Sequence, residues 1–251
     1  MRVSIIGSGN VATHIAKALY NANVTLLDVW SYSLANAQLL ANKVDARAIA
    51  ELSQISDEAD IVLIAVKDDA IVAVAEQLKN YKGLVAHTSG AIALDALIGN
   101  ENYGVFYPLQ TFSKHEELDF SNVPLCLEAN NANNLSLLKQ LAALISQSVY
   151  EVNSEQRKTL HLAAVFACNF PNYLYGIAQQ LLAQNQLDFN IIKPLIAETA
   201  NKVQSAFPNE VQTGPAVRND EQTLKKHEAM LQEHPAWLTI YKLLSDQIKK
   251  G

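Results

Sequence analysis

The feature that most constrains the fold of this chain is a glycine-containing turn near its first residue. Residues 3–6 read VSII, which is typical of a buried strand, and the apolar spacing after the turn is that of a helix. The turn between them has the pattern Gly-x-Gly-x-x-Ala, formed by Gly7, Gly9 and Ala12. A strand, a glycine turn and a helix in this order predict the first βα unit of a dinucleotide-binding fold.

Each patterned position of this turn suits a bound pyrophosphate. Gly7 permits a sharp bend, Gly9 lets the backbone approach phosphates closely, and Ala12 lets the helix pack against the strand. The free N–H groups at the start of the helix attract an anion. The alternative is a tight turn that binds no ligand. The residues expected to hold the pyrophosphate are Gly7, Ser8, Gly9, Asn10 and Val11.

Apolar strands and helices continue to alternate through the N-terminal half of the chain. Further strands are expected at residues 24–30, 59–66, 83–87, 104–107, 125–128 and 149–152. The run at 59–66 is the most apolar of these, as a central parallel strand should be. From residue 153 helical spacing dominates. We therefore predict an α/β fold, with a mostly parallel sheet in a dinucleotide-binding domain over residues 1–152 and an all-helical second domain over residues 153–251.

The composition of the chain restricts its partners and its location. Hydrophobic residues make up 49% of the chain and charged residues 18%, which is ordinary for a globular protein with a sizeable core. The net charge of −6, with no basic stripe, argues against nucleic acid. No signal peptide or transmembrane run is visible, so we expect a cytoplasmic protein without a membrane partner. Cys126 and Cys168 lie in apolar stretches without metal-ligand spacing, which predicts buried thiols and no metal site.

The ends of the second and third predicted strands are expected to contact the two riboses of a dinucleotide, because ligands collect at the carboxyl ends of parallel strands. Ser31 and Tyr32 follow the second strand and would face the adenosine ribose. Val66 and Lys67 end the third strand and would face the nicotinamide ribose. Asp28 lies 21 residues after the first glycine, where a carboxylate could hold a ribose hydroxyl. The alternative is that Asp28 is a carboxylate at the edge of the strand.

Two further strand ends carry polar side chains suited to a substrate. His87 and Ser89 offer an imidazole and a hydroxyl for a carboxylate or a carboxamide. The alternative for Ser89 is that it caps the following helix. Gln110 lies in a polar loop after the strand at 104–107, where turn formation is the alternative to a functional role.

The first helix of the second half carries a polar cluster within an alanine-rich stretch. His161 and Asn169 are separated by about 12 Å along a straight helix, so they could line one pocket without binding the same atom. Asn172 continues the same face. The alternative for His161 is a histidine satisfied within the core. Pro171 is expected to kink or interrupt this helix.

Seven segments of the chain together resemble a family of bacterial predicted NADP-dependent oxidoreductases. They are GSGNVATHIAKAL, AVKDDAI, AHTSG, YGVFYPLQTFS, SEQRKTLHLAAVFACNFPNYLY, PLIAETANK and QTGPAVRND. The resemblance covers nearly the whole chain and implies a Rossmann-like domain followed by a helical domain of unknown function. This two-domain plan is similar to that of pyrroline-5-carboxylate reductase and the β-hydroxyacid dehydrogenases.

The resemblance implies hydride transfer between NADP or NAD and a small carbonyl, imine or hydroxy compound, in a homodimer. A dinucleotide-binding sensor or partner-binding protein without catalysis is the alternative. The family's arginine after the second strand is Tyr32 here, which leaves the choice between NAD and NADP open.

The catalytic lysine of the β-hydroxyacid dehydrogenases has no counterpart between His161 and Asn172. A different proton donor is therefore required. The resulting catalytic candidates are His161, Asn169 and Ser89, and the substrate candidates are His87, Gln110 and Asn172.

Overall fold

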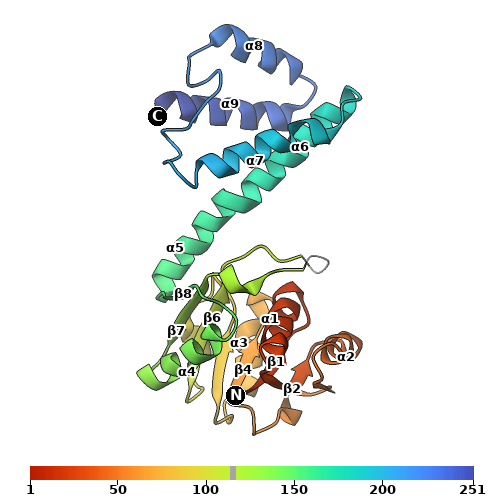
Figure 1. Ribbon diagram of the computed structural model, residues 1–251, viewed down its shortest axis with the longest axis vertical. Coiled ribbons are helices and arrows are strands. Elements are labelled where there is room, and N and C mark those ends of the chain that lie inside the picture. The colour runs from red at the N-terminus through yellow and green to blue at the C-terminus, as the bar shows by residue number, and fades with distance from the viewer. Residues whose placement is uncertain (114–116) are drawn as a thin grey trace. The chain divides into compact units, whose positions relative to one another are not determined.

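One eight-stranded sheet organises the N-terminal part of the computed structural model, which describes residues 1–113 and 117–251 (Figure 1). The strands lie in the order β3-β2-β1-β4-β5-β6-β7-β8, and every neighbouring pair is parallel except β6 and β7. Their bounds are β1 Arg2–Ile6, β2 Thr25–Trp30, β3 Arg47–Ile49, β4 Ile61–Ile64, β5 Leu84–His87, β6 Tyr103–Pro108, β7 Leu125–Ala129 and β8 Val149–Glu151. The short strand β3 was not predicted.

Helices cover both faces of this sheet. Side chains of α1, α2 and α4 share one hydrophobic core with the strands, and side chains of α3 form a second core against the opposite face. The apolar side chains of α1 whose spacing predicted a helix face the core, since Ala12, Ile15, Ala16 and Leu19 are all buried. The helices are α1 Asn10–Asn21, α2 Leu34–Ala41, α3 Ile71–Gln77, α4 Ala132–Ala143 and α5 Ser154–Ala164.

The order of the strands creates a switch point between β1 and β4. From β1 the chain moves to β2 and β3 on one side, and it returns to place β4 on the other side of β1. The loops after β1 and β4 therefore diverge, and they leave a crevice at the carboxyl ends of these strands. In open α/β sheets this is the position where ligands bind.

A fully buried arginine attaches α5 to the sheet. Arg157 Nη1 lies 2.5 Å from a carboxylate oxygen of Glu128 on β7, and Nη2 donates to the carbonyl of Ile92 over 2.7 Å. The Asn153 side chain caps this helix, because it accepts from the N–H of Gln156 in a capping box. A buried guanidinium is stable only with such partners, so they set the position of α5.

The chain divides into two compact units, Met1–Asn169 and Phe170–Gly251. The second contains α6 Phe170–Gln184, α7 Lys193–Lys202, α8 Glu221–Met230 and α9 Pro235–Lys250. The predicted class, a mostly parallel α/β sheet followed by helices, is confirmed. The division lies after Asn169, whereas the sheet ends with Glu151 next to the predicted domain boundary, which stays a prediction.

A π-helical segment, Val165–Asn169, separates α5 from α6. Pro171 follows it and has no N–H to donate to the preceding turn, so the predicted interruption near this proline takes the form of a π turn. Cys168 lies in the π turn and is exposed, which corrects its prediction as a buried thiol, whereas Cys126 is buried as predicted. Within the described ranges, no helix is long and apolar enough to cross a membrane.

We expect loss of the buried ion pair to destabilise the first unit. Arg157→Met keeps most of the side-chain volume but leaves the Glu128 carboxylate, whose side chain is 17% exposed, without its cation. The free energy of unfolding should fall by about 3 kcal/mol. A urea titration in a Trp237→Phe background measures it, because Trp30 then reports on the first unit alone.

The matched control is Lys158→Met on the next residue, whose ion pair with Glu155 is solvent-exposed. This change should alter the free energy of unfolding by less than about 1 kcal/mol. Equal effects of the two substitutions would contradict the assigned role of Arg157.

Candidate functional site

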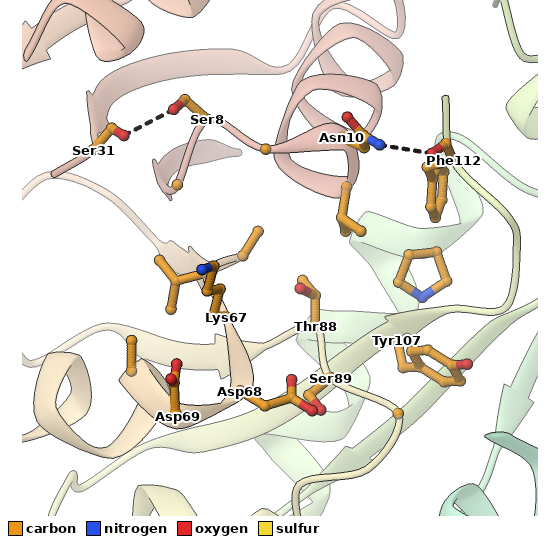
Figure 2. Close-up of a pocket in the computed structure, with 18 of the residues that line it drawn as sticks. Ser8, Asn10, Ser31, Lys67, Asp68, Asp69, Thr88, Ser89, Tyr107 and Phe112 are labelled. Carbon is orange, nitrogen blue, oxygen red and sulfur yellow. Dashed lines mark hydrogen bonds between the residues drawn. The ribbon is translucent and has the colours of Figure 1, made fainter. Parts of the chain in front are cut away.

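A pocket of about 960 Å³ opens at the carboxyl ends of the strands, within the first unit. Its volume lies in the range of sites that enclose small molecules and cofactors. Figure 2 shows the side chains that converge on it from the ends of β1, β2, β4, β5 and β6. The predicted site residues that line it are Gly7, Ser8, Gly9, Asn10, Val11, Ser31, Tyr32, Val66, Lys67, Ser89, Gln110 and His161.

The glycine turn forms one wall of the pocket, and its first position accepts only glycine. Gly7 has φ +127°, and its N–H donates to the carbonyl of Trp30 over 2.7 Å. A Cβ at this residue would lie 2.1 Å from the carbonyl oxygen of Ala65 at the end of β4. Any side chain here would therefore push apart the two strands that define the switch point.

Gly9 leaves the start of α1 open toward the pocket. It is the N-cap of α1, no side chain in the described part of the protein caps the helix, and the first turn of α1 holds no acidic residue. Apart from its chain neighbours, no atom of residues 1–113 or 117–251 lies within 4 Å of the position that a Cβ would take. The N–H groups of the first helical turn have no partner within the helix, so this wall is suited to an anion.

Hydroxyl groups and aromatic rings form the pocket wall at the end of β2. The hydroxyls of Ser8 and Ser31 are hydrogen-bonded over 2.8 Å (Figure 2). The Tyr32 side chain is 75% exposed and meets the Trp30 ring edge-on, with 4.9 Å between the ring centroids. This wall offers hydroxyl donors and a flat ring.

Asp28 does not reach the pocket. It is buried within β2, where its carboxylate accepts hydrogen bonds from Ser4, Arg47 and the N–H of Ser56. Of the two interpretations considered for this residue, the contact with a ribose is wrong and the strand carboxylate is correct.

The loop after β6 closes the pocket beside the start of α1. The Asn10 amide donates to the carbonyl of Phe112 over 2.8 Å (Figure 2), and His14 Nε2 lies 2.8 Å from the carbonyl oxygen of Ser113. Gln110 lies on this loop, and its side-chain oxygen accepts from the N–H of Thr111. The oxygen therefore forms a turn, while the amide NH₂ is left for a ligand.

A tyrosine and a histidine meet inside the pocket. Tyr107 comes from β6 and His161 from α5, and 3.1 Å separate the hydroxyl oxygen from Nδ1. Burial raises the pKa of Tyr107 to about 12, with a further contribution from Cys126, so the phenol stays protonated at neutral pH. A Cβ at Gly90 would come within 2.7 Å of both rings, so this contact requires glycine there.

Tyr107 was not among the predicted site residues. It ends an apolar strand and is nearly buried, and these are properties that it shares with ordinary core residues. The signal that could have identified it is its place immediately before Pro108, where the strand stops and the polar loop begins.

His87 is a structural residue, which corrects its prediction as a substrate contact. Its side chain is fully buried and outside the pocket lining. Nδ1 accepts from the N–H of Ser89, and Nε2 lies 3.3 Å from the carbonyl oxygen of Ala93. The loop that follows β5 therefore turns back over the ring. Burial, and secondarily the Arg157 guanidinium, lowers the pKa of His87 to about 4.

Ser89 both stabilises this loop and lines the pocket. Its hydroxyl oxygen accepts from the N–H groups of Ala91 and Ile92, each over 3.1 Å. These bonds lie within the loop, and the next helical turn, Leu94–Leu97, has Ala93 as its N-cap, so the predicted helix cap is wrong. These bonds occupy the lone pairs of the oxygen, and the O–H hydrogen remains for a ligand.

Asn169 is not among the described residues that line this pocket, and the role predicted for Asn172 stays a prediction. Both are exposed, Asn169 lies in the π turn, and Asn172 belongs to the second unit. The π turn changes the helical register after His161, so the straight-helix spacing used in the sequence analysis does not hold here.

The two glycines of the turn should respond differently to alanine. Gly7→Ala combines a positive φ with a backbone clash, so we expect a loss of at least about 2 kcal/mol in the free energy of unfolding. Gly9→Ala meets no atom and has φ −73°, so the fold should be kept to within about 1 kcal/mol. Urea titration of both variants tests this, and similar losses would contradict it.

The buried His87 should make stability depend on pH. Its pKa is lower in the folded than in the unfolded protein, so as pH falls the unfolded chain takes up the proton first. The stability is fully present above about pH 6.5 and is lost progressively toward pH 4, with a loss of about 2 kcal/mol by pH 5.

The His87→Gln variant isolates this effect, because the other histidines remain. Urea titrations at pH 7 and pH 5 should show a smaller loss of stability for the variant than for the wild type. A loss of equal size in both proteins would show that His87 is not the group responsible.

Comparisons with known proteins agree with this architecture. Residues 1–110 match the model of a Rossmann-like domain, and residues 123–248 match that of a domain of unknown function, DUF2520. The glycine turn formed by Gly7, Gly9 and Ala12 falls within the first match. A comparison with the curated proteins found no match.

Among solved structures, a protein from Bacteroides fragilis provisionally named an NADP oxidoreductase is 41% identical, with a TM-score of 0.92 over 100% of this chain and 98% of that one. A protein from Thermotoga maritima is 22% identical, with a TM-score of 0.81 over 99% and 100% of the two chains. Pyrroline-5-carboxylate reductase from Streptococcus pyogenes shares the fold at 15% identity, with a TM-score of 0.66 over 100% and 99%. The chain therefore belongs to the family that joins an N-terminal Rossmann-like domain to a C-terminal DUF2520 domain.

Proposed function

We propose that this protein is an NAD(P)-dependent oxidoreductase that transfers hydride between the nicotinamide and a small carbonyl, imine or hydroxy compound. The observation that carries the proposal is one pocket at the switch point, which joins an open helix N-terminus at Gly9 to the Tyr107–His161 pair. The name of the Bacteroides fragilis relative supports the same class of reaction.

The residues present fit a dinucleotide. At Gly9 there is space for a phosphate, and the first turn of α1 offers N–H groups without a competing side-chain cap. The glycine turn would hold the pyrophosphate, Ser31 and Tyr32 would face the adenosine ribose, and Val66 and Lys67 would face the nicotinamide ribose. When bound, the nicotinamide supplies or accepts the hydride.

The chain itself supplies the proton that must accompany the hydride. Reduction of a C=O or C=N bond places a proton on oxygen or nitrogen, and we assign its donation to the Tyr107 hydroxyl, which lies in the pocket beside His161. His161 Nδ1 is hydrogen-bonded to that hydroxyl and can return a proton to it. The free O–H of Ser89 and the amide NH₂ of Gln110 orient the substrate oxygen.

The competing proposal is a dinucleotide-binding sensor without catalysis. The observation that favours it is the absence of a catalytic lysine: among the described residues that line the pocket, none is a lysine from α5. Binding and turnover separate the two proposals.

Titration of the protein with NADH and with NADPH, followed by fluorescence, tests the first step. A panel of keto acids, aldehydes and cyclic imines then tests turnover through the loss of reduced cofactor. Absence of binding at millimolar dinucleotide would refute both proposals, and binding without turnover on the panel would favour the sensor.

For a substrate found in this way, we expect Tyr107→Phe to lower kcat about 100-fold, because the proton donor is removed. The Kd for the cofactor should change less than threefold, since the ring remains in place. Tyr103→Phe at the other end of β6 is the matched control and should retain full activity. Full activity of Tyr107→Phe would exclude Tyr107 as the donor.

The homodimer expected from the resemblance stays a prediction. Exposed apolar side chains in the second unit, such as Leu195, Met230 and Leu243, are the features that support it.

A further inference from the structure

The end of β2 carries no charged group toward the pocket. In dinucleotide-binding folds this strand end meets the adenosine 2′ position, where an acidic residue holds the hydroxyl of NAD and an arginine holds the phosphate of NADP. Here the pocket lining contributed by the end of β2 is Trp30, Ser31 and Tyr32.

An acidic residue of β2 and an arginine of β3 pair with each other instead of facing the pocket. Arg47 on β3 donates from Nε to the Asp28 carboxylate over 2.8 Å, and its Nη2 lies 2.7 Å from the same carboxylate oxygen. Nη2 also donates to the carbonyl of Gln54 over 2.8 Å. Neither Asp28 nor Arg47 lines the pocket. The arginine is thus held in a structural ion pair instead of facing a 2′-phosphate.

The other sources of positive potential near the pocket do not lie at the end of β2 with a free group. Among the described residues that line the pocket, Lys67 is the only lysine or arginine, and it follows β4, on the far side of β1 from β2. The α2 helix starts close to Tyr32, but the Ser33 side chain already caps its N-terminus by accepting from the N–H of Asn36.

We infer that the pocket selects NAD(H) over NADP(H), with Ser31 and Tyr32 as the residues that determine this preference. The inference rests on the proposed function. The Ser8–Ser31 hydroxyl pair can hydrogen-bond a ribose 2′-hydroxyl, and the exposed Tyr32 ring can pack on the adenosine. A 2′-phosphate would meet the same hydroxyls and no cation, so much of its charge would remain without a partner. A preference for NAD(H) would differ from the cofactor in the name of the Bacteroides fragilis relative, which is NADP.

Equilibrium binding of NADH and NADPH to the full chain tests the inference without any substrate. We expect the Kd for NADPH to be at least about tenfold higher than the Kd for NADH, the cost of one missing charge-assisted contact. Tyr32→Arg supplies that contact, so it should lower the Kd for NADPH about tenfold and change the Kd for NADH less than threefold.

Three control variants make the result specific to this position. Tyr20→Arg adds the same charge at an exposed tyrosine of α1 outside the pocket and should leave the ratio of the two Kd values unchanged. Lys67→Gln should weaken both dinucleotides alike. Arg47→Ala should leave the ratio unchanged, and selective loss of NADPH binding in this variant would overturn the inference.

The outcomes separate this inference from the proposed function. If neither dinucleotide binds, the proposed function fails. If NADPH binds as tightly as NADH or more tightly, the proposed function stands and the NAD preference is wrong. If Tyr32→Arg leaves NADPH binding unchanged, Tyr32 does not lie at the 2′ position and its assigned role is wrong.

Discussion

The close approach of the backbone at Gly7 to the carbonyl of Ala65 is the constraint on which the site depends. It leaves no room for a side chain between the ends of β1 and β4, the two strands between which the sheet changes direction. The N–H of Ala65 donates to the carbonyl of Ile6 over 2.7 Å and joins these strand ends. The hydrogen bond from Gly7 to Trp30 holds the end of β2 in the same place. Three strand ends are thereby joined by backbone contacts, and the side chains of the loops that follow them line the pocket.

The wall that these contacts form is polar without being strongly charged. N–H groups of the first turn of α1, hydroxyls and an amide provide the hydrogen bonds. The charged side chains in the lining are Lys67 and its exposed neighbours Asp68 and Asp69, whose charges are of opposite sign to that of the lysine. Such a wall can hold a pyrophosphate through the helix N-terminus, which attracts an anion by its dipole. It has less to offer a further phosphate placed away from that helix.

Much of the fold could be predicted from the sequence because its signals are local. The glycine turn and the longer apolar strands each depend on a few neighbouring residues, and they were predicted close to their observed places. The strand β3 was missed because three residues with an exposed arginine give little periodicity. The predicted cofactor residues all line the pocket, since the ends of parallel strands necessarily share one edge of the sheet.

The substrate side was harder to predict because it depends on long-range packing. A histidine at a strand end can face the ligand or the core, and only the loop that turns back over His87 decides between them. Asn169 and Asn172 were placed by assuming a straight helix, which the π turn before Pro171 interrupts. Tyr107 was missed because its partner comes from a helix that is 54 residues distant in the chain.

The buried arginine connects the stability of the first unit to its chemistry. Arg157 and His161 are four residues apart on α5, so they lie on the same side of the helix, one turn from each other. The ion pair with Glu128 and the bond to Ile92 fix the first of these turns against β7 and the loop after β5. The next turn then presents His161 to Tyr107 on β6, across the space left by Gly90. The buried Arg157, which attaches α5 to the sheet, therefore also helps to set the distance between Tyr107 and His161, the two groups proposed to transfer the proton.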